Sequence, residues 1–200
     1  RLRGAGVRFH VRHRWFGWQA DGSLRFTTPQ GEVAIKADAV ILALGGGSWA
    51  KLGSDGAWVQ LLIERGIPVV LLRPANCGFD VAWSAYFRER FAGQPIKPVI
   101  ARVGQQSQQG EFNITNNGVE GGLIYALSAP LRDAIERDGK ATLTLDLAPG
   151  RSLERLIADL SKPQGRDSLA NHLRRRVGID GVKAALLREF CPISALTVTV

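Results

Sequence analysis

The chain has 200 residues, of which 45% are apolar and 22% charged, and it carries a formal net charge of +8 at neutral pH. This composition is ordinary for a globular protein that buries a sizeable core, as one domain or two small ones. Its longest apolar runs, residues 39–44 and 67–72, fall far short of the roughly 18 residues that a membrane span requires, so we expect no membrane partner. Two cysteines without a CxxC spacing argue against a disulfide framework or a zinc site and indicate reduced thiols in the cytoplasm.

The first third of the chain reads as a β-meander followed by a buried strand. Residues 6–12, 24–28 and 32–36 alternate apolar and polar side chains, which predicts strands, and Asp21-Gly22 is a hairpin turn signal. The next run, residues 39–44, consists of small and branched apolar residues. Such a run predicts a short strand that is buried on both faces, as in a parallel sheet.

Three glycines follow this predicted strand. Gly45, Gly46 and Gly47 would let the backbone adopt positive φ and approach a ligand, at the edge where open α/β sheets bind cofactors. Ser54 or Asp55 is a good N-cap for a helix that ends near Gly66 and Pro68. If the start of this helix lies near the triple glycine, its free N–H groups would face a ligand placed there.

After Pro74 the sequence pattern becomes typical of short strands and turns, and later of helices. Strands are predicted over residues 77–83, 96–104, 110–115 and 141–147, and residues 115–122 are predicted to be a loop. A helical stretch is predicted over 123–137, with Gly139 ending it. Three helices follow, over 153–160, 169–177 and 181–190, with Ser152 as one N-cap and Asp167 or Ser168 as another. We therefore expect a partial cofactor-binding lobe over 1–72, a β-rich domain over 73–148, a helical domain over 149–195, and the start of a further strand over 196–200.

The order of these motifs resembles the BaiN-like family of bacterial FAD/NAD(P)-dependent oxidoreductases, uncharacterised flavoproteins of unknown substrate. The segments that carry the resemblance are ADAVILALGGGSWAKLGSDGAWVQLLIERGI, LLRPANCGF, EFNITNNGVEGGLIYALSAPLRDAI, LDLAPGRSLERL and SLANHLRRRVG. The resemblance implies a mixed α+β and α/β fold. In it, a Rossmann-like lobe from a two-dinucleotide-binding-domain flavoprotein carries an inserted β-barrel-like domain and a small helical domain, with FAD lying between the lobe and the inserts.

The resemblance also suggests site residues. The family's strand-end turn, commonly ATGG, falls on Leu44, Gly45 and Gly46, so a leucine stands where a threonine is usual, and Gly47 extends the turn. Its TGDG-like turn falls on Ser54, Asp55 and Gly56. A family segment usually written FTHxGLSGP falls on residues 115–122 and is expected to face the flavin, and Asn116, Glu120 and Gly121 within it are expected to face the substrate. Here Asn116 replaces the histidine, and Glu120-Gly121-Gly122 replaces Ser-Gly-Pro.

Two absences shape the functional expectation. The family's main FAD fingerprint, GxGxxG between a strand and a helix, does not occur in these 200 residues, and neither does methionine. We therefore expect an internal piece of a longer protein, which alone binds FAD weakly or not at all and which needs the rest of its own chain as a partner. The family activity would pass electrons from NAD(P)H through FAD to a small organic acceptor, with catalytic residues that the sequence does not identify.

The positive charge leaves an alternative open. Arginines cluster at residues 1–14 and again within 151–189, which would suit a basic interaction module or a nucleic-acid-binding module. No aromatic interleaving, RNP-like motif or helix-turn-helix pattern supports nucleic acid, and a solvated arginine-rich surface explains the charge more simply. The histidines, His10, His13 and His172, are isolated in sequence, and no spacing predicts a metal site.

Overall fold

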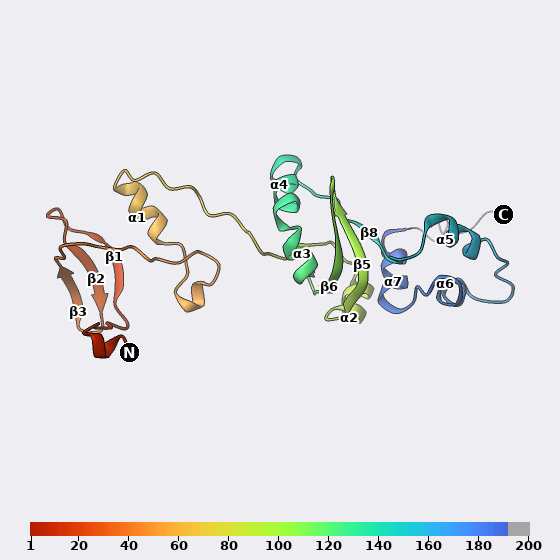
Figure 1. The fold of residues 1–200 in the computed structure, drawn as a ribbon, viewed down its shortest axis with the longest axis horizontal. Helices are drawn as coiled ribbons and strands as arrows, with labels where there is room; N and C mark the ends of the chain where they lie inside the picture. The colour runs from red at the N-terminus through yellow and green to blue at the C-terminus, as the bar shows by residue number, and fades with distance from the viewer. Residues whose placement is uncertain (192–200) are drawn as a thin grey trace. The chain divides into compact units, whose positions relative to one another are not determined.

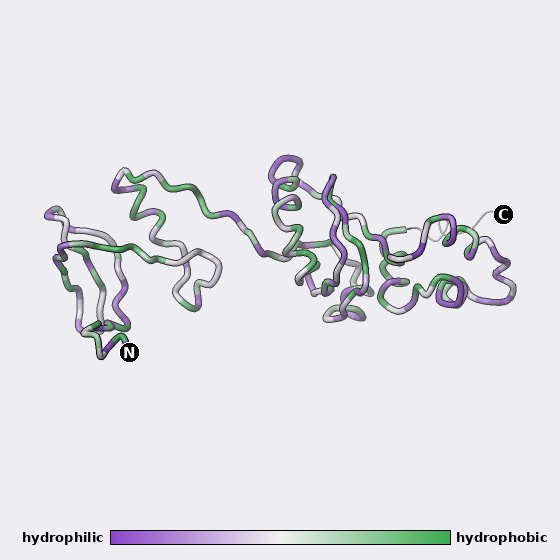
Figure 2. The backbone as a smooth tube through the Cα atoms, in the orientation of Figure 1, coloured by the Kyte–Doolittle hydropathy of each residue, from purple (hydrophilic) through white to green (hydrophobic). Residues whose placement is uncertain are grey.

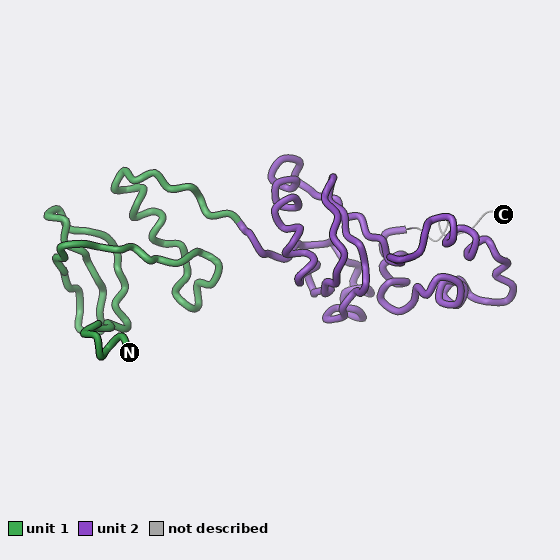
Figure 3. The backbone as a smooth tube through the Cα atoms, viewed as in Figure 1, with its two compact units in different colours: residues 1–73 green, residues 74–200 purple. Residues whose placement is uncertain are grey.

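The computed structural model describes residues 1–191, and the chain forms two compact units, residues 1–73 and residues from Pro74 onward (Figures 1 and 3). Each unit is described by itself. The predicted strand over 196–200 lies outside the described residues. No helix in the described part of the chain is long and apolar enough to cross a membrane.

Unit 1 is built on a three-stranded antiparallel sheet in the order β1-β2-β3. Its strands are β1 (Arg14–Trp18), β2 (Leu24–Thr28) and β3 (Gly31–Ile35). The predicted turn at Asp21-Gly22 is confirmed, because the Asp21 carboxylate accepts the backbone N–H of Ser23 at 2.9 Å and Gly22 has φ +85°. The strand predicted over 24–28 is confirmed, and the one over 32–36 is shifted by a single residue.

Two predicted strands in unit 1 are wrong. Residues 6–12 follow a 3-10 turn, η1 (Arg3–Ala5), and stay irregular up to Arg12, whose φ is +57°. Residues 39–44 form no strand, and the side chain of Ile41 is 93% exposed. A strand inside a parallel sheet needs a hydrogen-bonding neighbour on each side, and none of the described strands pairs with this segment. Figure 2 shows it as an apolar extended stretch that leads away from β3.

A short helix completes unit 1. After η2 (Ala50–Leu52) comes α1 (Trp58–Glu64), which contacts the sheet where Leu61 approaches Gly17. Gly66 ends the helix as predicted, with φ +73° and its N–H bonded to the carbonyl of Ile63 at 2.8 Å. The predicted N-cap at Ser54 or Asp55 is wrong, because the helix begins three residues later, at Trp58, and has no side-chain cap.

The centre of unit 2 is a five-stranded antiparallel sheet in the order β4-β7-β6-β5-β8. It has a long hairpin, β5 (Pro95–Val103) and β6 (Gln106–Ile114), and three short strands, β4 (Phe79–Asp80), β7 (Gly118–Glu120) and β8 (Thr144–Asp146). The predicted strand-rich character of this region is confirmed, although β7 falls in a segment that we expected to be a loop.

Helices cover this sheet and close one apolar core. They are α2 (Ala85–Phe91), which the sequence did not predict, α3 (Gly122–Ala126) and α4 (Ser128–Asp138), which divide the predicted 123–137 stretch. Gly139 ends α4 as predicted, with φ +73°. The most deeply buried core side chains are Phe87, Ile96, Val99, Phe112, Ile114 and Ile124.

The last three helices occur where the sequence predicts them. They are α5 (Leu153–Leu160), α6 (Leu169–Val177) and α7 (Gly181–Phe190). Ser152 and Ser168 are the N-caps of α5 and α6, each accepting a backbone N–H three residues later at 3.3 Å. Helices α5 and α6 pack against each other, whereas α7 packs against α2 and contributes Leu186 to the core of the sheet.

Candidate functional site

The two glycine turns predicted to bind a cofactor lie together in unit 1. A Cβ atom added to Gly47 would lie 3.6 Å from the Cα of Gly56, and one added to Gly56 would lie 3.5 Å from the Cα of Gly47. The hydroxyl of Ser54 is 3.7–3.8 Å from the corresponding positions on Gly45 and Gly46. The structure therefore brings residues 45–47 and 54–56 close together. From the sequence, this proximity was only an assumption.

Bare backbone defines this place, and it is open to solvent. Gly45 and Gly56 have φ +73° and +69°, a conformation that side-chain-bearing residues rarely adopt. Gly45, Gly46 and Gly47 are exposed, and Leu44 before them is half-buried. Gly47 is also tightly packed, because its added Cβ would lie 3.0 Å from the Leu72 side chain. We call residues 44–47 and 54–56 the glycine cradle.

An ion pair that the sequence did not predict closes one side of the cradle. The guanidinium of Arg14, at the start of β1, donates to the Asp55 carboxylate at 2.7 Å. The other oxygen of Asp55 accepts the backbone N–H of Ala57 at 3.1 Å. The Ala57 N–H and Arg14 together hold the pKa of Asp55 below its ordinary value, so this carboxylate stays ionised at neutral pH. It can accept a hydrogen bond from a hydroxyl or a ring N–H.

The three residues expected to face the substrate belong to unit 2. Asn116 is exposed in the turn between β6 and β7, where Thr115 bonds the backbone of Gly118. Glu120 is exposed at the end of β7, and Gly121 has φ +111° beside the backbone of Phe112. Their placement follows from strand pairing and the turn, and no hydrogen bond to the side chain of Asn116 or Glu120 ties either residue to a site among the described residues.

Unit 2 contains an apolar cavity of about 1080 Å³ beside its sheet. Residues from β4, α4, β8 and α7 line it, and Phe79, Trp83 and Phe190 contribute aromatic rings. The Trp83 indole donates to the carbonyl of Gly118 at 3.2 Å, so its polar atom is already paired. The lining therefore offers flat apolar surface to a ligand and few free polar groups.

A second cavity in unit 2 is lined by charged residues instead of apolar ones. Like the first, it was not predicted from the sequence. Its volume is about 480 Å³, and its lining is formed by Arg151, Arg155, Asp159, Lys162, Arg175 and Arg176. Sequence reasoning noted the arginine excess over 151–189 but not that it surrounds one carboxylate. The available signal was the spacing of charged residues in and just after α5. Arg155 precedes Asp159 by four residues, and Lys162 follows it by three.

Metal chemistry has no site in the described part of the chain. Within residues 1–191, no group of three or more His, Cys, Asp and Glu side chains lies close enough to hold a metal ion. Cys77 and Cys191 are both free, and both are half-buried. His172 is buried and bonded to the carbonyl of Leu160 at 3.1 Å, which is a structural contact between α6 and α5.

A family model described as "HI0933-like protein barrel and H2TH domain" matches residues 73–198, which is well over half of the chain. The matched range includes the whole sheet of unit 2 and its three final helices. No curated protein matches the chain.

Proposed function

Since the chain belongs to the HI0933-like family by its barrel and H2TH domain, we propose that it is part of a flavin-dependent oxidoreductase. The family is associated with flavoproteins, which agrees at a coarse level with the resemblance to BaiN-like oxidoreductases. The finer proposal is that FAD binds the glycine cradle, that NAD(P)H supplies the electrons, and that a small organic molecule accepts them.

One observation carries this proposal, the close approach of Gly47 and Gly56. Their backbones lie so near that a side chain on either would meet the other, and the neighbouring glycines expose main chain to solvent. A flat ring system can pack against such a surface because no Cβ atom projects from it. The residues present fit a flavin in this respect. Residues 44–47 would contact the cofactor through their backbone, and Ser54 and Asp55 would accept hydrogen bonds from its polar groups.

Bound flavin would supply the electron transfer, and the chain's own residues would place the reactants. Arg14 would hold Asp55 in position as an ionised acceptor. The exposed Asn116 and Glu120 are the polar residues proposed to face the substrate. None of these residues is assigned a proton-transfer role.

The test uses protein expressed from the whole gene. We expect a GxGxxG motif within about one hundred residues upstream of this chain, and one FAD per polypeptide after purification. The variant G46V should lose most of the flavin, because the side chain would project into the cradle. The control is G4V, at another glycine without a positive φ and with nothing within 4 Å of its added Cβ, and it should keep its flavin. A flavin content that G46V and G4V leave equally intact would contradict the proposal.

Addition of NAD(P)H then tests the electron donor separately from flavin binding. Bleaching of the flavin absorbance under anaerobic conditions would support the electron donor. A flavin that is bound but stays oxidised would leave the cradle in place and remove NAD(P)H from the proposal.

The alternative function, a basic interaction or nucleic-acid-binding module, is supported by the arginine-lined cavity in unit 2. That feature is compatible with a flavoenzyme, because it lies in the matched domain and shares no residue with the cradle.

A further inference from the structure

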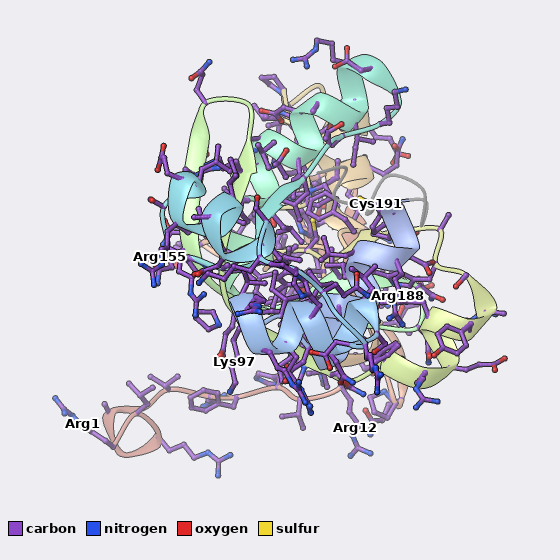
Figure 4. The ribbon with its side chains drawn as sticks, turned by 90° about the vertical axis from the view of Figure 1, so that its right-hand side faces the viewer. Arg1, Arg12, Lys97, Arg155, Arg188 and Cys191 are labelled. Carbon is purple, nitrogen blue, oxygen red and sulfur yellow. The ribbon has the colours of Figure 1, made fainter. Side chains whose placement is uncertain are left out.

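Helices α5 and α6 and the segments flanking α5 line a solvent-open cavity that concentrates positive charge. Five of its six lining residues are arginine or lysine, and the sixth is Asp159. Arg155, labelled in Figure 4, lies on α5, and its side chain is 72% exposed. The cations come from the segment before α5, from α5 itself, from the turn after it and from the end of α6, so the fold gathers them from separate places.

Asp159 holds three of these cations in fixed positions. Its side chain is only 10% exposed, and its two oxygens are contacted by Lys162 Nζ at 2.8 Å and Arg155 Nε at 3.1 Å. Arg151 lies 3.8 Å away and also donates to the backbone carbonyl of Arg176 at 2.9 Å, which ties the entry of α5 to the end of α6. These contacts gather the three side chains around one carboxylate.

The carboxylates present do not neutralise this charge. Asp159 is shared by three cations, and Asp167 pairs with Arg175 at 2.9 Å. Arg176 makes no ion pair with a described residue. Five positive charges against two negative ones leave about three unbalanced charges around one cavity, and like charges held this close repel unless an anion joins them.

We propose that this cavity binds a compact ligand carrying phosphate groups, of about the size of a nucleotide. The planar guanidinium fork matches two phosphate oxygens, and charge-assisted bonds of this kind are the strong ones. A volume of about 480 Å³ lies in the range of small-molecule sites. The cations converge on one carboxylate instead of following a face, which favours a compact polyanion over an extended nucleic acid strand. This inference does not rest on the flavin proposal, because its residues lie in unit 2.

Pyrophosphate is the probe that tests it, by isothermal titration calorimetry at low ionic strength with the whole 200-residue chain. We expect saturable binding of one pyrophosphate per chain that weakens as salt is raised. The variant R155Q/R176Q should bind at least about tenfold more weakly, because each arginine loses charge-assisted hydrogen bonds to the anion. R155K/R176K keeps the charge and loses only the fork, so it should fall between the two.

The matched control is R88Q/R102Q, which removes the same charge from exposed positions on α2 and β5. It should bind pyrophosphate like the parent protein, and circular dichroism checks that all variants are folded. Equal losses in control and cavity variants would overturn the proposal by showing a general charge effect. Absence of saturable pyrophosphate binding to the parent would also overturn it. So would tight binding of a DNA or RNA duplex that pyrophosphate does not compete away, which would favour the nucleic-acid alternative.

Discussion

The ammonium group of Lys183 donates a 2.7 Å hydrogen bond to the backbone carbonyl of Leu147, and a second, also of 2.7 Å, to the carbonyl of Pro98. Lys183 lies on α7, Pro98 on β5, and Leu147 just after β8. One side chain thus joins a helix of the last third of the chain to two strands of the sheet. Partial burial of the ammonium lowers the pKa of Lys183, and the carboxylates of Asp146 and Asp180 oppose that shift.

Replacing Lys183 by methionine keeps most of the length of the side chain and removes both hydrogen bonds. We expect K183M to lower the free energy of unfolding of unit 2 by about 2 kcal/mol, the usual size of a loss of charged hydrogen bonds. Urea unfolding followed by circular dichroism measures it. K97M removes an exposed lysine with only a 3.7 Å ion pair to Glu111, so it should cost less than about 0.5 kcal/mol. Equal effects of the two variants would show that Lys183 does not fasten α7.

Gly118 permits the pairing of β4 with β7. A Cβ atom at this position would lie 1.9 Å from the carbonyl oxygen of Phe79 and 2.8 Å from the Cα of Asp80. We expect G118A to cost at least about 3 kcal/mol, because backbone must move to admit the methyl group. Differential scanning calorimetry would detect the lowered melting temperature. Gly122 begins α3 with nothing within 4 Å, so G122A should be neutral or slightly stabilising.

Acid should loosen the contacts around Asp159. Hydrogen bonds from Lys162, and then from Arg155, hold the pKa of Asp159 below its ordinary value of 3.8. A carboxyl whose pKa is lowered by folding stabilises the native state above that ordinary value, and the stabilisation is lost as the pH falls through the lower, folded pKa. The difference in stability between the parent and D159N should therefore be full near neutral pH and shrink below about pH 4. Melting temperatures measured from pH 3 to 7 give this difference, and a constant difference would contradict it.

Ser84 should matter for two reasons. Its hydroxyl caps α2 by accepting the N–H of Phe87 at 3.1 Å, and it donates to the carboxylate of Glu189 on α7 at 2.8 Å. We expect S84A to cost about 1–2 kcal/mol, and S84T to retain most of the stability because threonine also caps helices. Urea unfolding distinguishes the two variants. A loss in S84T as large as in S84A would show that the hydroxyl is not the stabilising group.

Several local features of the fold were predictable from sequence, although the predicted N-cap at Ser54 or Asp55 was wrong and α2 was missed. Features that need a distant partner were not predictable. The caps at Ser152 and Ser168 and the stop at Gly139 involve residues within one turn of the helix, so residue type and spacing identify them. The failed strand over 39–44 shows the other case. Its apolar residues fit a parallel strand, but strand formation depends on neighbours that the segment itself does not specify.

The candidate site shows the same division. The positive φ of Gly45 and Gly56 could be expected from glycine itself, whereas the approach of Gly47 to Gly56 depends on how the chain returns through η2. The Arg14–Asp55 ion pair spans 41 positions, and the cavity between α5 and α6 depends on helix packing. Strand β7 was missed because it follows Asn116 and Asn117 and begins with Gly118, a sequence typical of a turn.

The exposure of Ile41 and Val70 has a practical consequence for anyone who purifies this polypeptide. Unpaired main-chain N–H and C=O groups beside exposed apolar side chains promote β-type association between separate molecules of the chain. The rate of aggregation at high concentration will then depend on unit 1 and will say little about the free energy of unfolding of unit 2.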